Sequence, residues 1–165
     1  MLIRYPAESL VHGKQNYLSF LLYSTRQLFA IMSEQYVQGM REMRSHFGKA
    51  ADKWIEVIHD IYPEFAKVNV EFPFGELYRR DVIDTKTREL CTLAALTVQG
   101  FALPELKVHI LGNLNAGSSR DEILEVITQM IAYCGFPAAT NALLAAKEVF
   151  DELDSHVGDQ EAREN

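Results

Sequence analysis

The stretch from residue 84 to residue 150 constrains the fold more than any other part of the chain, because residues that start or stop helices bound each of its apolar segments. Asp84 can cap a first helix, whose apolar residues recur at three- and four-residue steps until Gly100 ends it. Pro104 suits the first turn of the next helix, and Gly117 suits its left-handed end. Because few residues separate the two, they should pack as antiparallel neighbours. The sequence therefore predicts a helical hairpin.

Two more helices are predicted after this hairpin. Ser119 and Glu122 have the spacing of a capping box, in which each side chain binds the other's backbone N–H. The apolar stripe that follows comprises Ile123, Ile127, Met130, Ile131 and Cys134, and Gly135 stops it. Pro137 then opens an Ala-rich helix that we expect to end near Leu153.

The residues before the hairpin also have helical periodicity. Apolar side chains recur at helical spacing from Tyr36 to Phe47, and a second amphipathic segment runs from Asp52 to Tyr62 before Pro63. Residues 65–80 predict a short helix or turn and then an aromatic loop. Since no convincing strand pattern occurs, the fold class is all-α, with the hairpin over residues 86–116 at its centre.

Length and charge favour one soluble domain. The chain has 165 residues, enough for a single core, and a net charge of −7, which disfavours nonspecific nucleic-acid binding. Its two cysteines lack metal-ligand spacing and are too few for a disulfide scaffold, so we expect no metal site and a reducing cytoplasm. No segment reads as a membrane span.

The two ends differ from the part between them. Residues 17–31 are apolar and aromatic but interrupted by Arg26, and Met32 reads like a second translation start. We interpret residues 1–31 as an extension outside the core domain; the alternative is an amphipathic helix that covers an oligomer surface. The domain itself is expected over residues 32–155, followed by a polar tail over residues 156–165.

Glu89 and His109 are the ionisable pair that the hairpin can bring together. They lie twenty residues apart, near the start of one helix and the middle of the next, so they can face each other across the turn. A carboxylate beside an imidazole fixes its tautomer and makes a proton shuttle. The alternative is structural: a first-turn Glu favoured by the helix dipole, beside a polar His at an oligomer seam.

Several motifs resemble the carboxymuconolactone decarboxylase family, whose fold is shared with AhpD-type alkylhydroperoxidases. The likeness covers roughly residues 36–153. It is carried by Tyr36-Val-Gln-Gly39, Phe74-Gly75-Glu76-Leu-Tyr78, Thr87-Arg-Glu-Leu, Glu105-Leu-Lys-Val-His109, Asn115-Ala-Gly117, Asp121-Glu-Ile-Leu-Glu-Val and Tyr133-Cys-Gly-Phe-Pro137. The resemblance implies an AhpD-like fold, a trimer or hexamer, and Glu89 and His109 as the proton-relay pair of the AhpD-type proteins.

One departure disfavours the usual thiol peroxidase. The AhpD-type proteins carry Cys-x-x-Cys at the start of the helix that bears the His, whereas residues 100–109 here contain no cysteine. Dithiol chemistry needs an attacking thiolate and a resolving partner. Cys91 and Cys134 are the possible redox residues, and both are more typical of small buried hydrophobes.

Decarboxylation of the family's namesake lactone requires neither metal nor organic cofactor, because the lactone carbonyl accepts the electrons. Arg80 or Arg88 could hold a substrate carboxylate, and His109 could deliver a proton or bind the oxyanion. The expected apolar wall comprises Phe72, Phe74, Tyr78 and Tyr133. Alternatively, these arginines are surface residues and these aromatics belong to the core.

Two departures separate the chain from the namesake enzymes. By the resemblance, those enzymes carry tryptophans where Phe74 and Tyr78 stand, and a small polar residue where Glu89 stands. Our first hypothesis is a cofactor-independent decarboxylase acting on a small anionic lactone from aromatic catabolism. The second is an AhpD-like, peroxiredoxin-type antioxidant protein that uses a lone cysteine, and the third is a non-catalytic ligand-binding oligomer.

Overall fold

The computed structural model describes residues 33–164, so the predicted extension over residues 1–31 lies outside the described part. Within it the chain forms seven α-helices and one π-helical segment. These are α2 (Glu34–Phe47), α3 (Lys49–Ile61), α4 (Pro63–Glu71), η1 (Pro73–Leu77), α5 (Thr85–Gln99), α6 (Leu103–Asn115), α7 (Arg120–Gln129) and α8 (Ile131–Glu164). No strand occurs between residues 33 and 164, so the all-α prediction is confirmed for these residues.

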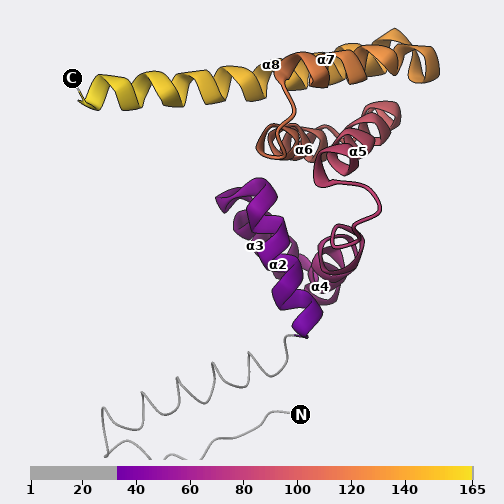
Figure 1. Ribbon diagram of the computed structural model, residues 1–165, viewed down its shortest axis with the longest axis vertical. Coiled ribbons are helices and arrows are strands. Elements are labelled where there is room, and N and C mark those ends of the chain that lie inside the picture. The colour runs from indigo at the N-terminus through magenta and orange to yellow at the C-terminus, as the bar shows by residue number, and fades with distance from the viewer. Residues whose placement is uncertain (1–32, 165) are drawn as a thin grey trace, which may run out of the picture.

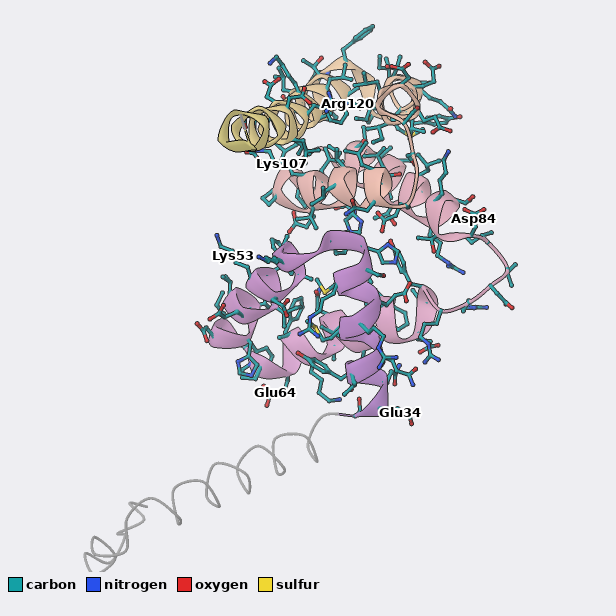
Figure 2. All side chains as sticks on the ribbon, turned by 60° about the vertical axis from the view of Figure 1, so that its left-hand side comes forward. Glu34, Lys53, Glu64, Asp84, Lys107 and Arg120 are labelled. Atoms are coloured by element: carbon teal, nitrogen blue, oxygen red, sulfur yellow. The ribbon has the colours of Figure 1, made fainter. Side chains whose placement is uncertain are left out.

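The helices are arranged in three layers, with the hairpin α5–α6 between the other two (Figure 1). Helices α2, α3 and α4 and the segment η1 lie on one side of the hairpin, and α7 and α8 lie on the other. Figure 2 shows the same order from another direction, with Lys107 of α6 beside α8 and Asp84 at the start of α5. Lys107 forms an ion pair with Glu148 of α8. The hairpin therefore contacts both outer layers.

The boundaries of the hairpin follow from local chemistry, as predicted. The Asp84 carboxylate accepts hydrogen bonds from the backbone N–H and the hydroxyl of Thr87, which caps α5. Gly100 ends α5 in the left-handed conformation, with φ of 72°, where a side chain would be strained. Pro104 lies in the first turn of α6.

The last two helices differ from the prediction at their ends. The capping box of Ser119 and Glu122 is present at the start of α7. However, α7 ends at Gln129 instead of continuing to Cys134, and Gly135, with φ of 75° and ψ of 172°, interrupts the start of α8. Helix α8 then continues past Leu153 to Glu164, and several residues near its end, such as Glu161, Ala162 and Arg163, are strong helix formers. Despite the 34 residues of α8, no helix within residues 33–164 has the length and apolarity that crossing a membrane requires.

The interior consists of two apolar clusters, one on each side of the hairpin. The first joins α5 and α6 to α7 and α8 and includes Leu93, Leu106, Ile110, Ile123, Ile127, Ala142, Ala146 and Phe150. The second joins α2, α3, α4 and η1 and includes Met40, Met43, Phe47, Ile55, Ala66, Val70 and Phe74. Val108 of α6 packs against the second cluster. The face of the hairpin that meets α2 therefore lies at the boundary between these two clusters.

Candidate functional site

Glu89 and His109 meet across the hairpin, at the junction with α2. Nδ1 of His109 lies 2.9 Å from Oε2 of Glu89, so the imidazole donates to the carboxylate through this nitrogen. The Glu89 side chain is fully buried, whereas 18% of the His109 side chain is exposed. A buried carboxylate needs hydrogen bonds or opposite charge to offset its lost hydration. Glu89 is therefore suited to hold the ring of His109 in one orientation and one tautomer.

Two residues of α6 allow this close approach. Gly112 faces Glu89: a Cβ atom there would lie 2.9 Å from Oε2 of Glu89 and 2.5 Å from a ring carbon of Phe47. Asn113 is buried, and its side-chain amide donates to the backbone carbonyls of Glu89 (3.1 Å) and His109 (2.8 Å). Gly112 leaves space for the Glu89 side chain, and the Asn113 amide holds α5 and α6 in a fixed register.

A second histidine, His46 of α2, contacts the same carboxylate. Nδ1 of His46 lies 3.6 Å from Oε1 of Glu89, and its Nε2 lies 3.0 Å from Oε1 of Glu42. Only 4% of the His46 side chain is exposed. Glu89 is thus placed between two imidazoles from two different layers of the fold.

A cavity of about 460 Å³ adjoins His109. Its walls are largely aromatic and aliphatic and come from η1 and from helices α2 to α6. They comprise Met43, Phe47, Trp54, Ile58, Phe65, Pro73, Phe74, Leu77, Tyr78 and Val108, with the polar residues Asn69, Thr92, Glu105 and His109. This size and composition are typical of a site for a small organic ligand. Because Nδ1 of His109 is bound to Glu89, Nε2 is the ring nitrogen that remains for a ligand.

Tyr78 contributes an uncharged phenol to the cavity. Burial raises the pKa of Tyr78 well above its ordinary value, and the negative charge of Glu89 raises it further. The charge of nearby Arg88 acts in the opposite direction and is the smaller effect. The phenol oxygen lies 3.4 Å from the hydroxyl oxygen of Thr92. Tyr78 can therefore donate a hydrogen bond, but it does not serve as a base near neutral pH.

The structure brings some of the predicted substrate-binding residues together and separates others. Phe74 and Tyr78 line the cavity with His109. Arg80 and Arg88 do not line it; Arg88 instead donates to the backbone carbonyl of Arg80 at 2.6 Å. Tyr133 lies at the start of α8 with 72% of its surface exposed and is likewise absent from the cavity wall. Phe72, which we expected in the same apolar wall, is also mostly exposed.

The two cysteines stand apart from the cavity. Cys91 is exposed on α5, although Glu89 of the same helix is buried, because two residues along a helix point to different faces. Cys134 is partly buried, and its thiol donates to the carbonyl of Met130 at 3.2 Å. Neither thiol lines the cavity. Within residues 33–155, no three His, Cys, Asp or Glu side chains converge in the manner of a metal site.

Sequence reasoning missed His46, Gly112 and Asn113. The spacing of Glu42 and His46, four residues apart on one predicted helix, was a local signal for a paired histidine. No local signal connected His46 to Glu89, which lies 43 positions later in the chain. Only the packing of α2 against the hairpin made this connection.

Sequence comparisons with known proteins identify a family model and several relatives that match this chain. The model of the carboxymuconolactone decarboxylase family matches residues 63–148, which include α4, η1 and the whole hairpin. The chain is 34% identical over 128 residues to an uncharacterized 15.0 kDa protein of Paracoccus denitrificans, an alignment that covers 76% of this chain and 96% of that protein.

Two relatives are named as decarboxylases. The chain is 31% identical over 121 residues to 4-carboxymuconolactone decarboxylase of Acinetobacter baylyi, which covers 73% of this chain and 90% of that enzyme. It is 30% identical over 83 residues to nitrosuccinic acid decarboxylase of Metarhizium robertsii, which covers 50% of this chain and 57% of that enzyme. With its motifs, its all-α fold and these matches taken together, the chain belongs to the carboxymuconolactone decarboxylase family.

Proposed function

We propose that the protein is a cofactor-independent decarboxylase acting on a small anionic lactone from the breakdown of aromatic compounds. The observation that carries this proposal is the buried Glu89–His109 pair, whose imidazole opens onto a cavity of largely apolar walls. Two relatives from different organisms are named as decarboxylases, which supports the same class of reaction.

The proposed reaction uses the substrate as its own electron acceptor. The bond between carbon and the departing carboxylate breaks, and its electron pair moves onto the lactone carbonyl as CO₂ leaves. The developing oxyanion can accept a hydrogen bond from Nε2–H of His109 or from the neutral phenol of Tyr78. His109 then transfers the proton at Nε2 to the carbon, and Glu89 holds the ring during this transfer.

The walls of the cavity suit the loss of a charged group. Phe47, Phe74 and Trp54 present apolar surface to the substrate, which disfavours a carboxylate relative to neutral CO₂. Tyr78 and Thr92, whose hydroxyl oxygens lie 3.4 Å apart, are uncharged hydrogen-bond donors in this wall, so we place the retained carboxylate beside them.

We further propose that the protein assembles as a trimer or hexamer. Large apolar side chains are exposed on two faces of the described chain. One face, on α3 and α4, carries Val57, Ile61, Tyr62, Phe65, Val68 and Phe72; the other, on α5 and α8 and between α5 and α6, carries Val98, Phe101, Tyr133, Phe136 and Leu144. Patches of this kind commonly mark interfaces. Light scattering coupled to size exclusion should give a mass three or six times that of the chain, and a monomer at micromolar concentration would contradict the assembly.

Turnover of γ-carboxymuconolactone, generated in situ and followed by ultraviolet absorbance, tests the proposed function. We expect His109→Ala to lower kcat by about 10²–10⁴-fold, the usual contribution of general acid–base catalysis. His59→Ala is the matched control, because His59 is exposed on α3 and lies outside the cavity wall. The Cys91→Ser, Cys134→Ser double variant should keep its activity. Loss of lactone turnover in this variant would show that a thiol takes part and would contradict the proposed mechanism. An inactive but folded wild type would exclude this lactone as the substrate.

A further inference from the structure

Four ionisable side chains form a continuous array from the protein surface to the cavity. Glu42 contacts His46 at 3.0 Å, His46 faces Glu89 at 3.6 Å, and Glu89 contacts His109 at 2.9 Å. Glu42 is partly exposed, with 31% of its side chain accessible, and His109 borders the cavity. The two residues between them are buried. The array thus alternates carboxylate and imidazole along its whole length.

The surroundings of His46 are apolar except at its two ring nitrogens. Its ring lies 5.8 Å from that of Phe47, 6.4 Å from that of Phe74 and 5.1 Å from that of Tyr78, measured between centroids. Both nitrogens nevertheless face a carboxylate oxygen. A histidine that only filled space would not need two acidic partners in so apolar a setting.

Glu89 provides a second, independent observation. Its Oε2 is bound to His109, whereas its Oε1 is buried and has no hydrogen-bond partner in this conformation. Nδ1 of His46 is 3.6 Å from this oxygen, slightly beyond hydrogen-bond length. A shift of a few tenths of an ångström would complete the bond. The unsatisfied oxygen therefore points to His46 as its partner.

We propose that His46 is a positioning residue that couples the protonation of the Glu89–His109 pair to Glu42 at the surface. Only the expected effect of this coupling on turnover rests on the proposed function. The coupling itself is a property of the free protein. The contacts of His46 with Glu42 and Glu89 determine how firmly Glu89 holds the ring of His109.

The proton that reaches the substrate comes from His109 alone. His109 acts in its doubly protonated form, with Nδ1–H bound to Oε2 of Glu89 and Nε2–H facing the cavity. As Nε2–H breaks and the new C–H bond forms on the substrate, His109 becomes a neutral imidazole that keeps its Nδ1–H. Solvent returns one proton to Nε2 after the product leaves, so one proton is consumed for each CO₂ released. His46 and Glu42 exchange no proton in this step; they act on Glu89 at Oε1, and Glu89 holds the ring of His109.

The other groups that face this array do not take over its role. Tyr78, which follows η1, packs its ring edge against His46, but its raised pKa keeps it protonated. Phe47 of α2 and Phe74 of η1 have no dissociable proton. Asn115 of α6 donates to the backbone carbonyl of His46, and this bond holds α2 against α6 without involving an ionisable group.

Nuclear magnetic resonance of the ring nitrogens of ¹⁵N-histidine-labelled protein tests the coupling directly. Glu42→Gln is the main variant, because Glu42 is partly exposed and the amide keeps the shape of the carboxylate while removing its charge. We expect the nitrogen resonances of both His46 and His109 to shift, with assignments from His46→Asn and His109→Gln. Glu56→Gln, the same change at an exposed position of α3, should shift neither. A shift at His46 alone would overturn the inference.

Turnover of γ-carboxymuconolactone tests the consequence. In Glu42→Gln we expect kcat to fall about tenfold or more, with KM changed less than twofold, because Glu89 then holds the acid His109 less firmly. An unchanged kcat in an active protein would overturn the role of His46 in positioning that acid. If the wild type does not turn over the lactone, the proposed function fails, and the nitrogen shifts alone decide whether His46 couples Glu42 to His109.

Discussion

Replacing Gly112 with alanine tests whether the close approach of α6 to Glu89 holds the site together. On an exposed helix this change would stabilise the protein by about 1 kcal/mol, because alanine is the better helix former. At Gly112 the new Cβ would lie 2.5 Å from Phe47 Cε1 and 2.9 Å from Glu89 Oε2. Both neighbours are buried, so neither can move away freely.

The opposing costs exceed that gain. Overpacking a well-packed interior costs about 1–3 kcal/mol. Displacing the Glu89 carboxylate also weakens its bond to His109, and hydrogen bonds to charged groups contribute about 1.5–3 kcal/mol. The net loss of unfolding free energy is therefore about 1.5–5 kcal/mol. For a chain of this size each 1 kcal/mol corresponds to about 2–4 °C in Tm.

Thermal unfolding by circular dichroism measures this change, and a double-mutant cycle identifies its cause. Phe47→Leu removes the ring carbon that the new methyl group would meet, so Gly112→Ala should cost less in the Phe47→Leu background. We expect a coupling free energy of about 0.5–3 kcal/mol. A Gly112→Ala protein with an unchanged or higher Tm would refute the reasoning, as would strict additivity with Phe47→Leu.

Two other predictions concern stability. Asp84→Ala should lower the Tm near neutral pH, because Asp84 caps α5 and its hydrogen bonds to Thr87 lower the pKa of its carboxyl group. Since the folded-state pKa of Asp84 lies below its unfolded value, its contribution to stability is fully present above the unfolded pKa and is lost as pH falls through the folded pKa. A Tm difference between wild type and Asp84→Ala that persisted below that pH range would contradict the assignment. Ile127→Ala should lower the free energy of unfolding in urea by about 2–5 kcal/mol, because Ile127 is completely buried between the hairpin and α8. Thr128→Ala, on the exposed face of α7, should lower it by less than about 0.5 kcal/mol. Equal effects at these two positions would show that this cluster is not the core.

The helix ends were predictable wherever a local residue specifies them. Asp84 and Ser119 accept hydrogen bonds from backbone N–H groups three residues later, so the caps lie within one turn of sequence. Gly100 adopts a left-handed conformation that its residue type already favours. The break after Gln129 was missed because the apolar spacing continues across it, whereas the interruption at Gly135 was predicted from its residue type.

Only part of the candidate site could be predicted from the sequence. Glu89 and His109 belong to one hairpin with a short turn, so their separation in sequence fixed which faces could meet. The positions of Arg88 and Tyr133 outside the cavity wall depend on how the loop before α5 and the start of α8 lie in space. Neither periodicity nor capping reports on these placements.

The sequence by itself therefore determined the helices, the hairpin and one acid–base pair, because hydrogen bonds and side-chain spacing within a few turns specify them. The tertiary structure decided which residues surround that pair. It brought His46 to the free oxygen of Glu89, placed Phe74 and Tyr78 in the cavity wall and left both cysteines outside it. These arrangements arise from the packing of α2 against α6 and of η1 against α2, between segments far apart in the chain. Such packing depends on the shapes of many side chains at once.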